Sequence, residues 1–301
     1  MSDDVFYDRN PTDNRNLIKA KQNKNDEFYT LYDEVKVELD NYTNEFKNKT
    51  VYCNCDNPDI SNFSKYFRDN FEKLGLKRLI STCYPQGIME VVDYKGTRRF
   101  KLRGDGDFRS EECERILRNC DIVVTNPPFS LFIDFMNFIS KHSKKFLIIG
   151  NKNAIQNKEL IDRIVSGEIW NGFGSRKGKW WFICFERTEK GTYKEIDGVL
   201  HKTIPACWFT NFERPEMDIT FDTGLCFKDG MSQGLYKTYD ETDIINVNET
   251  KHIPMDYESV MGVPISFIDK FNPKQFELLG IIRPKINGKS IYTRLLIKKR
   301  K

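Results

Sequence analysis

Short apolar runs alternate with helical periodicities along roughly the first two thirds of the chain. Strands are predicted at residues 50–55, 79–84, 121–125 and 146–150. The last two contain short apolar runs, Ile122 to Val124 and Phe146 to Ile149, which are typical of buried parallel strands. Between the first two strands, aromatic residues at positions 63–71 recur at helical spacing and predict one apolar helix face. Strands that alternate with helices predict an α/β fold with a parallel sheet.

The pattern changes toward the end of the chain. Aromatic-rich strands are predicted at residues 179–186 and 206–212, and since no long helix separates them we expect an antiparallel edge. Residues 91–102 alternate roughly as a hairpin does. From about residue 216, Gly, Asp and Thr become frequent and no βα repeat continues. We therefore predict three parts: an arm at residues 1–20, a main domain at 21–215 and a smaller α+β region at 216–301.

Composition restricts the class of protein further. The 301 residues include 48 Lys plus Arg and 44 Asp plus Glu, and the formal net charge of +4 excludes a histone-like protein. Hydrophobic residues make up 39%, enough for a real core. No apolar run approaches a membrane span and the first residues are polar, so we expect a cytoplasmic location. The 8 Cys include no CxxC pair, and no metal site is predicted.

The most informative motif is Asn126-Pro127-Pro128-Phe129, which directly follows the predicted strand at 121–125. Ligands of open α/β sheets bind beyond the carboxyl ends of strands, where this motif lies. An exocyclic amine of adenine or cytosine is a poor nucleophile, because its lone pair is shared with the ring. Two acceptors that hold both amine hydrogens would favour a tetrahedral nitrogen. The Asn126 side-chain oxygen and the Pro127 carbonyl are the two candidates.

The other residues of the motif suit the same chemistry. Consecutive prolines fix φ and donate no N–H, so the carbonyls of Pro127 and Pro128 are held rigidly and stay free. Phe129 offers a flat face on which an extruded base can stack. Such acceptors act best in a preorganised, water-poor site. The motif therefore indicates methyl transfer to an amine, and the alternative is a proline-rich turn with a buried Phe.

Two acidic loops are candidates for cofactor binding. Asp56 follows the first predicted strand, where nucleotide-like cofactors sit, although the usual Gly-rich fingerprint is missing. It could bind the cationic methionine end of S-adenosylmethionine or cap the helix that begins near Ser61. Asp105 and Asp107 lie in a Gly-rich turn and could bind a metal ion, contact an adenine amine or cap the turn; with no further carboxylates nearby, metal binding is the least favoured.

A fourth candidate is the basic Gly loop at residues 172–178, which precedes Trp180 and Trp181. A flexible basic loop beside aromatic residues suits contact with phosphate or an unstacked base. The alternative is a surface loop before a core strand.

Several strings in order resemble the EcoRI-type adenine-specific DNA methyltransferase family. They are Asn25 to Thr30, Val51 to Asp56, Thr125 to Phe129, Met261 to Phe267 and Asn272 to Phe276. The resemblance runs from about residue 20 to near the end. It implies a Rossmann-like sheet, S-adenosylmethionine as methyl donor, and N6-methyladenine in DNA as product. The region at 21–215 would then be catalytic, and 216–301 would recognise the target.

The resemblance also implies roles for individual residues. Asn126 to Phe129 match the catalytic tetrapeptide, and Asp56 stands in the cofactor loop. The predicted cofactor-binding residues are Phe28, Tyr29, Thr30, Asn54, Asp56, Cys83 and Asp107. Methyltransferases at large carry a glycine pair after the first strand and an acid after the second, and this chain has neither.

We therefore predict a site-specific methyltransferase that flips its target adenine out of double-stranded DNA. The predicted protein is a monomer with no membrane partner, and a cognate restriction endonuclease could act separately. One alternative is methyl transfer to another nitrogen, such as RNA adenine, cytosine N4 or a protein glutamine. The other is a non-catalytic nucleic-acid binder on a methyltransferase-like fold.

The end of the chain is strongly basic. Residues 278–301 contain eight Lys or Arg and no acid. Apolar residues between these charges predict a strand that is ordered to about Ile297 and presents Arg294 from a fixed surface. The alternative is a solvated tail. The predicted DNA-binding residues are Arg176, Lys177, Lys179, Lys289, Arg294 and Lys298.

Overall fold

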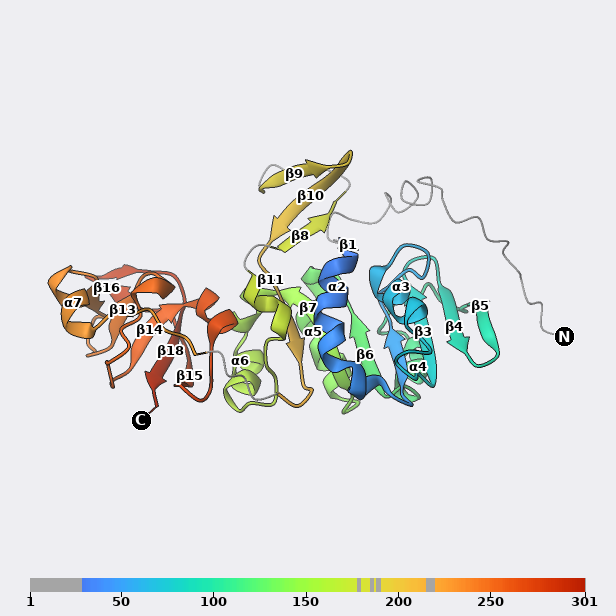
Figure 1. The fold of residues 1–301 in the computed structure, drawn as a ribbon, viewed down its shortest axis with the longest axis horizontal. Helices are drawn as coiled ribbons and strands as arrows, with labels where there is room; N and C mark the ends of the chain where they lie inside the picture. The colour runs from blue at the N-terminus through green and yellow to red at the C-terminus, as the bar shows by residue number, and fades with distance from the viewer. Residues whose placement is uncertain (1–28, 178–179, 185–186, 188–190, 215–219, 301) are drawn as a thin grey trace. The chain divides into compact units, whose positions relative to one another are not determined.

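The structure is a computed structural model, and it describes residues 29–177, 180–184, 187, 191–214 and 220–300 (Figure 1). The chain forms two compact units. The first combines the residues up to Asn151 with Gly172–Phe212, and the second combines Lys152–Asn171 with Glu213–Lys301. Among the helices of the described residues, none has the length and apolar character to span a lipid bilayer.

A mixed seven-stranded sheet forms the core of the first unit, in the order β11-β7-β6-β2-β3-β4-β5. The strands are β2 (Thr50–Cys53), β3 (Arg78–Cys83), β4 (Ile88–Asp93), β5 (Gly96–Lys101), β6 (Ile122–Thr125), β7 (Lys145–Asn151) and β11 (Ala206–Thr210). The pairings among β2, β3, β6 and β7 are parallel. Those of β4, β5 and β11 are antiparallel. The predicted α/β fold is confirmed, and β4 and β5 form the predicted hairpin.

Helices cover both faces of this sheet. They are α2 (Tyr32–Leu39), α3 (Asn62–Asp69), α4 (Glu111–Arg118) and α5 (Phe132–Ser140), with 3-10 turns η2 (Asp40–Phe46), η3 (Phe129–Leu131) and η5 (Phe173–Lys177). Phe63 of α3 packs on Trp208, and Phe132 of α5 packs on Phe209. Adjacent residues of a strand point to opposite faces, so α3 and α5 lie on opposite sides.

A small second sheet belongs to the same unit, with β1 (Tyr29–Thr30), β8 (Trp180–Ile183), β10 (Val199–Ile204) and β9 (Tyr193–Ile196) in this order (Figure 1). The prediction of one antiparallel edge at residues 179–186 and 206–212 is half right. β11 is the antiparallel edge strand of the large sheet, but β8 pairs with β1 and β10 instead. The reason is the β9–β10 hairpin, which lies between them in sequence and supplies the partner of β8.

The second unit is built on a five-stranded sheet in the order β12-β13-β14-β18-β15. Its strands are β12 (Tyr236–Thr238), β13 (Ile245–Val247), β14 (Met261–Pro264), β15 (Phe276–Ile282) and β18 (Arg294–Lys299), with the small pair β16 (Lys285–Ile286) and β17 (Lys289–Ser290). Its helices are α6 (Lys158–Val165) and α7 (Phe227–Ser232), with the turns η4 (Lys152–Gln156), η6 (Thr250–His252) and η7 (Ile265–Lys270). The strand predicted near the end of the chain is β18.

Candidate active site

The Asn126-Pro-Pro-Phe motif begins where β6 ends at Thr125 and leads into η3. Pro127 is buried, and Pro128 has the fixed backbone φ of −53°. The Pro128 carbonyl accepts a hydrogen bond from the Leu131 N–H at 3.0 Å. The Pro127 carbonyl accepts none from the residues that the structure describes. Of the two proline carbonyls, that of Pro127 is therefore the one that can accept a hydrogen bond from a substrate.

Phe129 lies at the surface of the motif rather than in the core. Its side chain is half-buried and meets the ring of Phe182 edge-on, with ring centroids 6.0 Å apart. Phe132, three residues later, is only 1% exposed and packs on Phe209. The two residues thus differ in a way that suits Phe129 for contact with a ligand and Phe132 for the core.

A residue of the predicted cofactor motif meets the catalytic motif. The Asn126 amide Nδ2 donates to Thr30 Oγ1 at 3.5 Å, although the two residues are 96 positions apart. Thr30 is buried and is fixed by β1–β8 pairing opposite Phe182, and its carbonyl accepts from Asn62. Tyr29 is half-buried in the same strand. Phe28, the third residue predicted here, lies outside the described residues.

The loop after β2 carries Asn54 and Asp56, both buried. The Asp56 carboxylate accepts from Ser61 Oγ at 2.6 Å and from the hydroxyl of Thr125. The same Thr125 hydroxyl accepts from the Cys55 N–H at 3.2 Å. Ser61, not Asp56, is the N-cap of α3, because its hydroxyl accepts from the N–H groups of Phe63 and Ser64. Asp56 therefore orients the cap and links this loop to the end of β6.

Thr125 is the residue of this arrangement that sequence reasoning missed. It is fully buried, yet it joins the β2 loop to the residue before Asn126. The available signal is its place as the single hydroxyl residue at the end of the apolar run Ile122 to Val124. A polar group in such a run needs a partner, and here the partners are functional candidates.

Cys83 ends strand β3, and the loop that carries Asp107 packs against it. Cys83 is buried at the end of β3, and a Cβ atom at Gly106 would lie only 2.3 Å from the Cys83 carbonyl oxygen. Only glycine permits this approach, which is reinforced by the positive φ of Gly106. The Asp107 carboxylate is paired with Arg109 at 2.6 Å, and this hydrogen-bonded pairing lowers the pKa of Asp107. Asp107 is therefore ionised and already has one cationic partner.

In the Gly loop at residues 172–178, two backbone amides already have an anionic partner within the protein, and the contact of this basic loop with phosphate or a base stays a prediction. The N–H groups of Phe173 and Gly174 donate to the carboxylate of Glu38 in α2, which is fully buried. A Cβ atom at Gly172 would collide with the same carboxylate. The anion at this loop is thus a side chain of the protein itself. The side chains of Arg176 and Lys177, and all of Lys179, lie outside the description.

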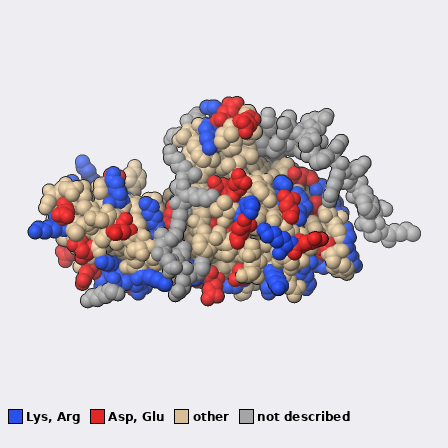
Figure 2. All heavy atoms as spheres, viewed as in Figure 1, with Lys and Arg blue, Asp and Glu red and all other residues tan. Residues whose placement is uncertain are grey.

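The three predicted DNA contacts of the second unit differ in exposure. Lys289 in β17 and Lys298 in β18 are exposed. Arg294 is buried, and its guanidinium donates to Asn246 at 3.0 Å and to Asn248 at 3.4 Å. The expectation that Arg294 is presented at the surface is wrong. Its guanidinium N–H groups donate to Asn246 in β13 and to Asn248 just after it. On the face that Figure 2 draws, Lys and Arg are mixed with Asp and Glu in each unit.

The residues of the β2 loop fit the methionine end of S-adenosylmethionine. The amide nitrogen and the amide oxygen of Asn54 are both buried, and neither has a hydrogen-bond partner among the described residues. Buried polar atoms normally have partners, so this amide fits a ligand that offers both an acceptor and a donor. An amino acid end, with its carboxylate and ammonium groups, offers both. Within the described residues, His, Cys, Asp and Glu form no cluster suited to a metal ion.

Comparison with known proteins places this chain among DNA-modifying enzymes. The family model described as adenine-specific methyltransferase EcoRI matches residues 16–95 and 86–300. The Type II methyltransferase M.EcoRI of Escherichia coli is 42% identical, over 97% of this chain and 98% of the relative.

Two mycoplasma proteins are also similar. The Type II methyltransferase M.MgeORF184P of Mycoplasma genitalium is 33% identical over 93% of this chain and 98% of its own length. The Type II methyltransferase M.MpnI of Mycoplasma pneumoniae is 34% identical over 88% of this chain and 85% of its own length. No solved structure gives a significant match.

Proposed function

The chain belongs to the EcoRI-type family of adenine-specific DNA methyltransferases, and on this basis we propose how its residues carry out the reaction. The resemblance seen in the motifs is thereby confirmed. The protein is a site-specific methyltransferase that acts on the N6 nitrogen of adenine in DNA and uses S-adenosylmethionine as methyl donor. The contact between Thr30 and Asn126 is the observation that carries the proposed assignment of residues.

Asn126 and Pro127 are proposed to hold the target amine. The hydrogen bond from Asn126 Nδ2 to Thr30 orients the amide, and its oxygen is the atom that can accept from the N–H of the target amine. The Pro127 carbonyl supplies the second acceptor, in a backbone that proline makes rigid. Two fixed acceptors favour the tetrahedral nitrogen whose lone pair attacks the methyl group. No residue needs to remove a proton first, because N6 becomes acidic only as the new bond forms.

Phe129 is proposed to stack on the adenine after the base has left the duplex. Its edge contact with Phe182 fixes the ring position, and its partial exposure leaves surface for a base. Stacking on an aromatic ring contributes about 1–3 kcal/mol per base. This energy offsets part of the cost of unpairing the target adenine.

The β2 loop is proposed to bind the methyl donor. Asn54 would hold the carboxylate and ammonium groups of its methionine end, and Asp56 would attract the ammonium charge. Thr30, Cys83 and Asp107 would contact the rest of the molecule from the neighbouring strand ends. When bound, S-adenosylmethionine supplies an electrophilic methyl group on a cationic sulfur. The Thr125 hydroxyl donates to Asp56, and Thr125 directly precedes Asn126. This contact fixes the position of the loop that binds the methyl donor relative to the motif that binds the adenine.

We further propose a division of labour along the chain. The seven-stranded sheet serves as a Rossmann-like catalytic core within residues 21–215, and residues 216–301 recognise the target sequence. Exposed Lys289 and Lys298 would contact phosphates. The enzyme would act as a monomer in the cytoplasm, alongside a cognate endonuclease that cuts the unmethylated site.

Expression in a bacterial host that lacks adenine methylation tests the function. We expect N6-methyldeoxyadenosine in digested plasmid DNA by mass spectrometry, and sequencing of native DNA should place it within one short sequence. Methylated cytosine or methylated RNA instead of adenine would overturn the assignment. So would a purified protein that binds S-adenosylmethionine but leaves DNA unmodified.

A further inference from the structure

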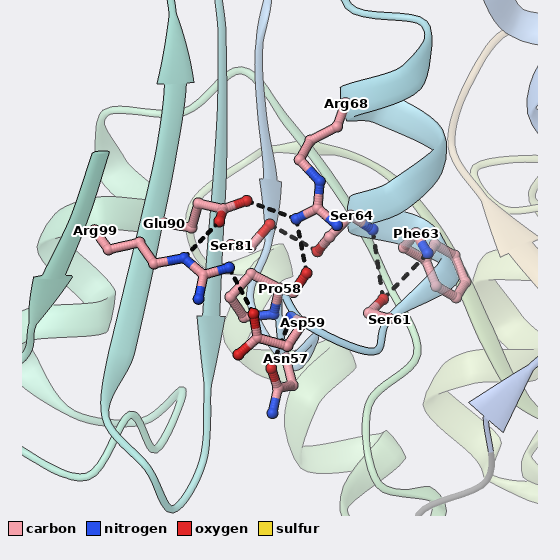
Figure 3. Close-up of polar contacts among 10 residues, drawn as sticks. All are labelled: Asn57, Pro58, Asp59, Ser61, Phe63, Ser64, Arg68, Ser81, Glu90 and Arg99. Atoms are coloured by element: carbon pink, nitrogen blue, oxygen red, sulfur yellow. Dashed lines mark hydrogen bonds and ion pairs between the residues drawn. The ribbon is translucent and has the colours of Figure 1, made fainter. Parts of the chain in front are cut away.

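Four charged side chains form a cluster behind the β2 loop, drawn in Figure 3. Glu90 of β4 is buried between two arginines, Arg68 of α3 at 2.6 Å and Arg99 of β5 at 2.8 Å. Arg99 also pairs with Asp59 of the loop at 2.6 Å. Two cations and two anions thus alternate, and the buried carboxylate is fully compensated.

The cluster contacts the β2 loop (residues 54–61) at two residues, Pro58 and Asp59. Arg68 Nη1 donates to the carbonyl of Pro58 at 2.7 Å as well as to Glu90. Arg99 Nη2 reaches the carboxylate of Asp59, whose own N–H is held by Asn57. Figure 3 shows Arg68 on α3 and Arg99 on the β4–β5 hairpin, both pointing toward the loop. Residues 57–59 are therefore held from outside by Arg68 and Arg99, in addition to the turn that the loop forms through Asn57.

The loop after the first strand has no glycine between Asn54 and Ser61. A glycine-rich loop brings its backbone close to a ligand through its own conformation. In this loop the side chains of Asn54 and Asp56 are the groups proposed to meet the ligand, so the backbone that carries them must keep one conformation. Ordering each residue costs about 1–2 kcal/mol, and the contacts of Arg68 and Arg99 offset part of this cost.

We propose that Glu90, acting through Arg68 and Arg99, is a positioning residue that holds the β2 loop in its cofactor-binding conformation. The inference rests on the proposed role of this loop in binding S-adenosylmethionine. Glu90 does not touch the site itself. Its charge keeps the two arginines in place, and they hold Pro58 and Asp59 so that Asn54 and Asp56 are presented correctly.

Strand β4 provides a matched control for this role. Asp93 is equally buried on the same strand and also pairs with two arginines, Arg98 at 2.6 Å and Arg78 at 3.7 Å. It lies at an odd separation from Glu90 and so on the opposite face of the strand. Its partners among the described residues are Lys95, Arg98 and Arg78, and none of these belongs to the β2 loop. Loss of either acid removes one buried charge, but only loss of Glu90 releases the loop.

The test compares Glu90→Gln with Asp93→Asn in the full-length protein. Isothermal calorimetry gives the Kd for S-adenosylmethionine, thermal unfolding gives stability, and steady-state kinetics gives kcat at saturating donor. We expect both variants to lose similar stability. Glu90→Gln should weaken donor binding about tenfold, the effect of losing a charged hydrogen bond, while Asp93→Asn leaves it unchanged. The kcat at saturating donor and the KM for DNA should be kept in both.

A second pair covers the case in which Glu90→Gln does not fold. Arg99→Ala removes the contacts with Asp59 and Glu90, and Arg98→Ala removes the corresponding cation of the same strand, which pairs with Asp93 instead. Donor affinity should fall in the first and not in the second. Equal losses within a pair, or wild-type affinity in both Glu90→Gln and Arg99→Ala, would overturn the inference while wild-type methylation stands. A wild-type protein that binds no S-adenosylmethionine would overturn the proposed function as well.

Discussion

The ends of β6 and β2 meet at one site but are held by different means. After β6, Pro127 and Pro128 restrict the backbone directly, so the motif carries most of its rigidity in its own sequence. After β2, the loop forms a turn at Asn57, and side chains from α3 and β5 that pair with Glu90 of β4 add a second set of contacts from outside. Thr125 hydroxyl joins the two loops.

This difference predicts two kinds of mutational sensitivity. In the β6 motif, residues that face the substrate are the sensitive ones, because the backbone needs little support. In the β2 loop, residues remote from the ligand matter as well. Substitutions after β6 should therefore lower kcat or base capture, and those after β2 should weaken binding of the methyl donor.

The largest effect is expected for Asn126→Ala. The substitution removes one acceptor for the amine but no group proposed to hold the methyl donor. The methylation rate should fall by about 10²–10³-fold, the loss typical for one preorganised polar group. Single-turnover methylation measures the rate, and calorimetry should show nearly unchanged affinity for S-adenosylmethionine. Near-normal turnover would contradict the catalytic assignment and remove the basis of the comparison.

Phe129→Ala should have the next largest effect. Losing about 1–3 kcal/mol of stacking weakens capture of the flipped adenine by about 5- to 150-fold. Fluorescence of 2-aminopurine at the target position reports base flipping. Phe132→Ala is the matched control, because Phe132 is buried against Phe209. The control should lose thermal stability and keep its flipping signal, and a reversed result would assign the two rings the opposite roles.

Asp56→Ala tests the β2 side of the comparison. The hydroxyls of Ser61 and Thr125 lose their acceptor, and we expect affinity for S-adenosylmethionine to fall about tenfold with kcat at saturation kept. Asp121 serves as the control, since it accepts from the Thr50 N–H at the opposite ends of the same two strands. Asp121→Ala should lower stability without changing donor affinity. A fall in kcat alone for Asp56→Ala would mean that the β2 loop contributes to the chemical step and not to binding of the methyl donor.

The same comparison explains what the sequence predicts. Apolar runs and the proline motif are local signals, so the parallel strands and the position of Asn126 could be read directly. Thr30 could be placed in the cofactor motif, but not beside Asn126, because the two lie 96 residues apart. Glu38 occupies the amides of a loop 135 residues away, and no local pattern indicates such a pairing.

Charge is the property that the sequence predicted least well. Arg294 and Lys298 both lie in β18, but one donates to buried asparagines and the other is exposed. The basic composition of the segment is the same for both residues. What separates them is the set of polar groups that the fold places opposite each one, which depends on strand order and not on spacing alone.

The smallest effect is expected far from both loops, at Lys298. This residue is exposed and lies opposite Glu277 in the β15–β18 register. As a phosphate contact, Lys298 contributes about one unit to the salt slope of DNA binding, so in Lys298→Ala the loss of affinity between 50 and 200 mM salt should be about fourfold smaller than in the wild type. All DNA sequences should be affected alike, and kcat and donor affinity should be unchanged. Glu277→Ala is the informative partner variant: it should strengthen DNA binding slightly, because it removes an anion beside the same phosphate. An unchanged slope in Lys298→Ala would remove Lys298 from the DNA interface, and a changed kcat would show that DNA contact and chemistry are not carried by separate residues.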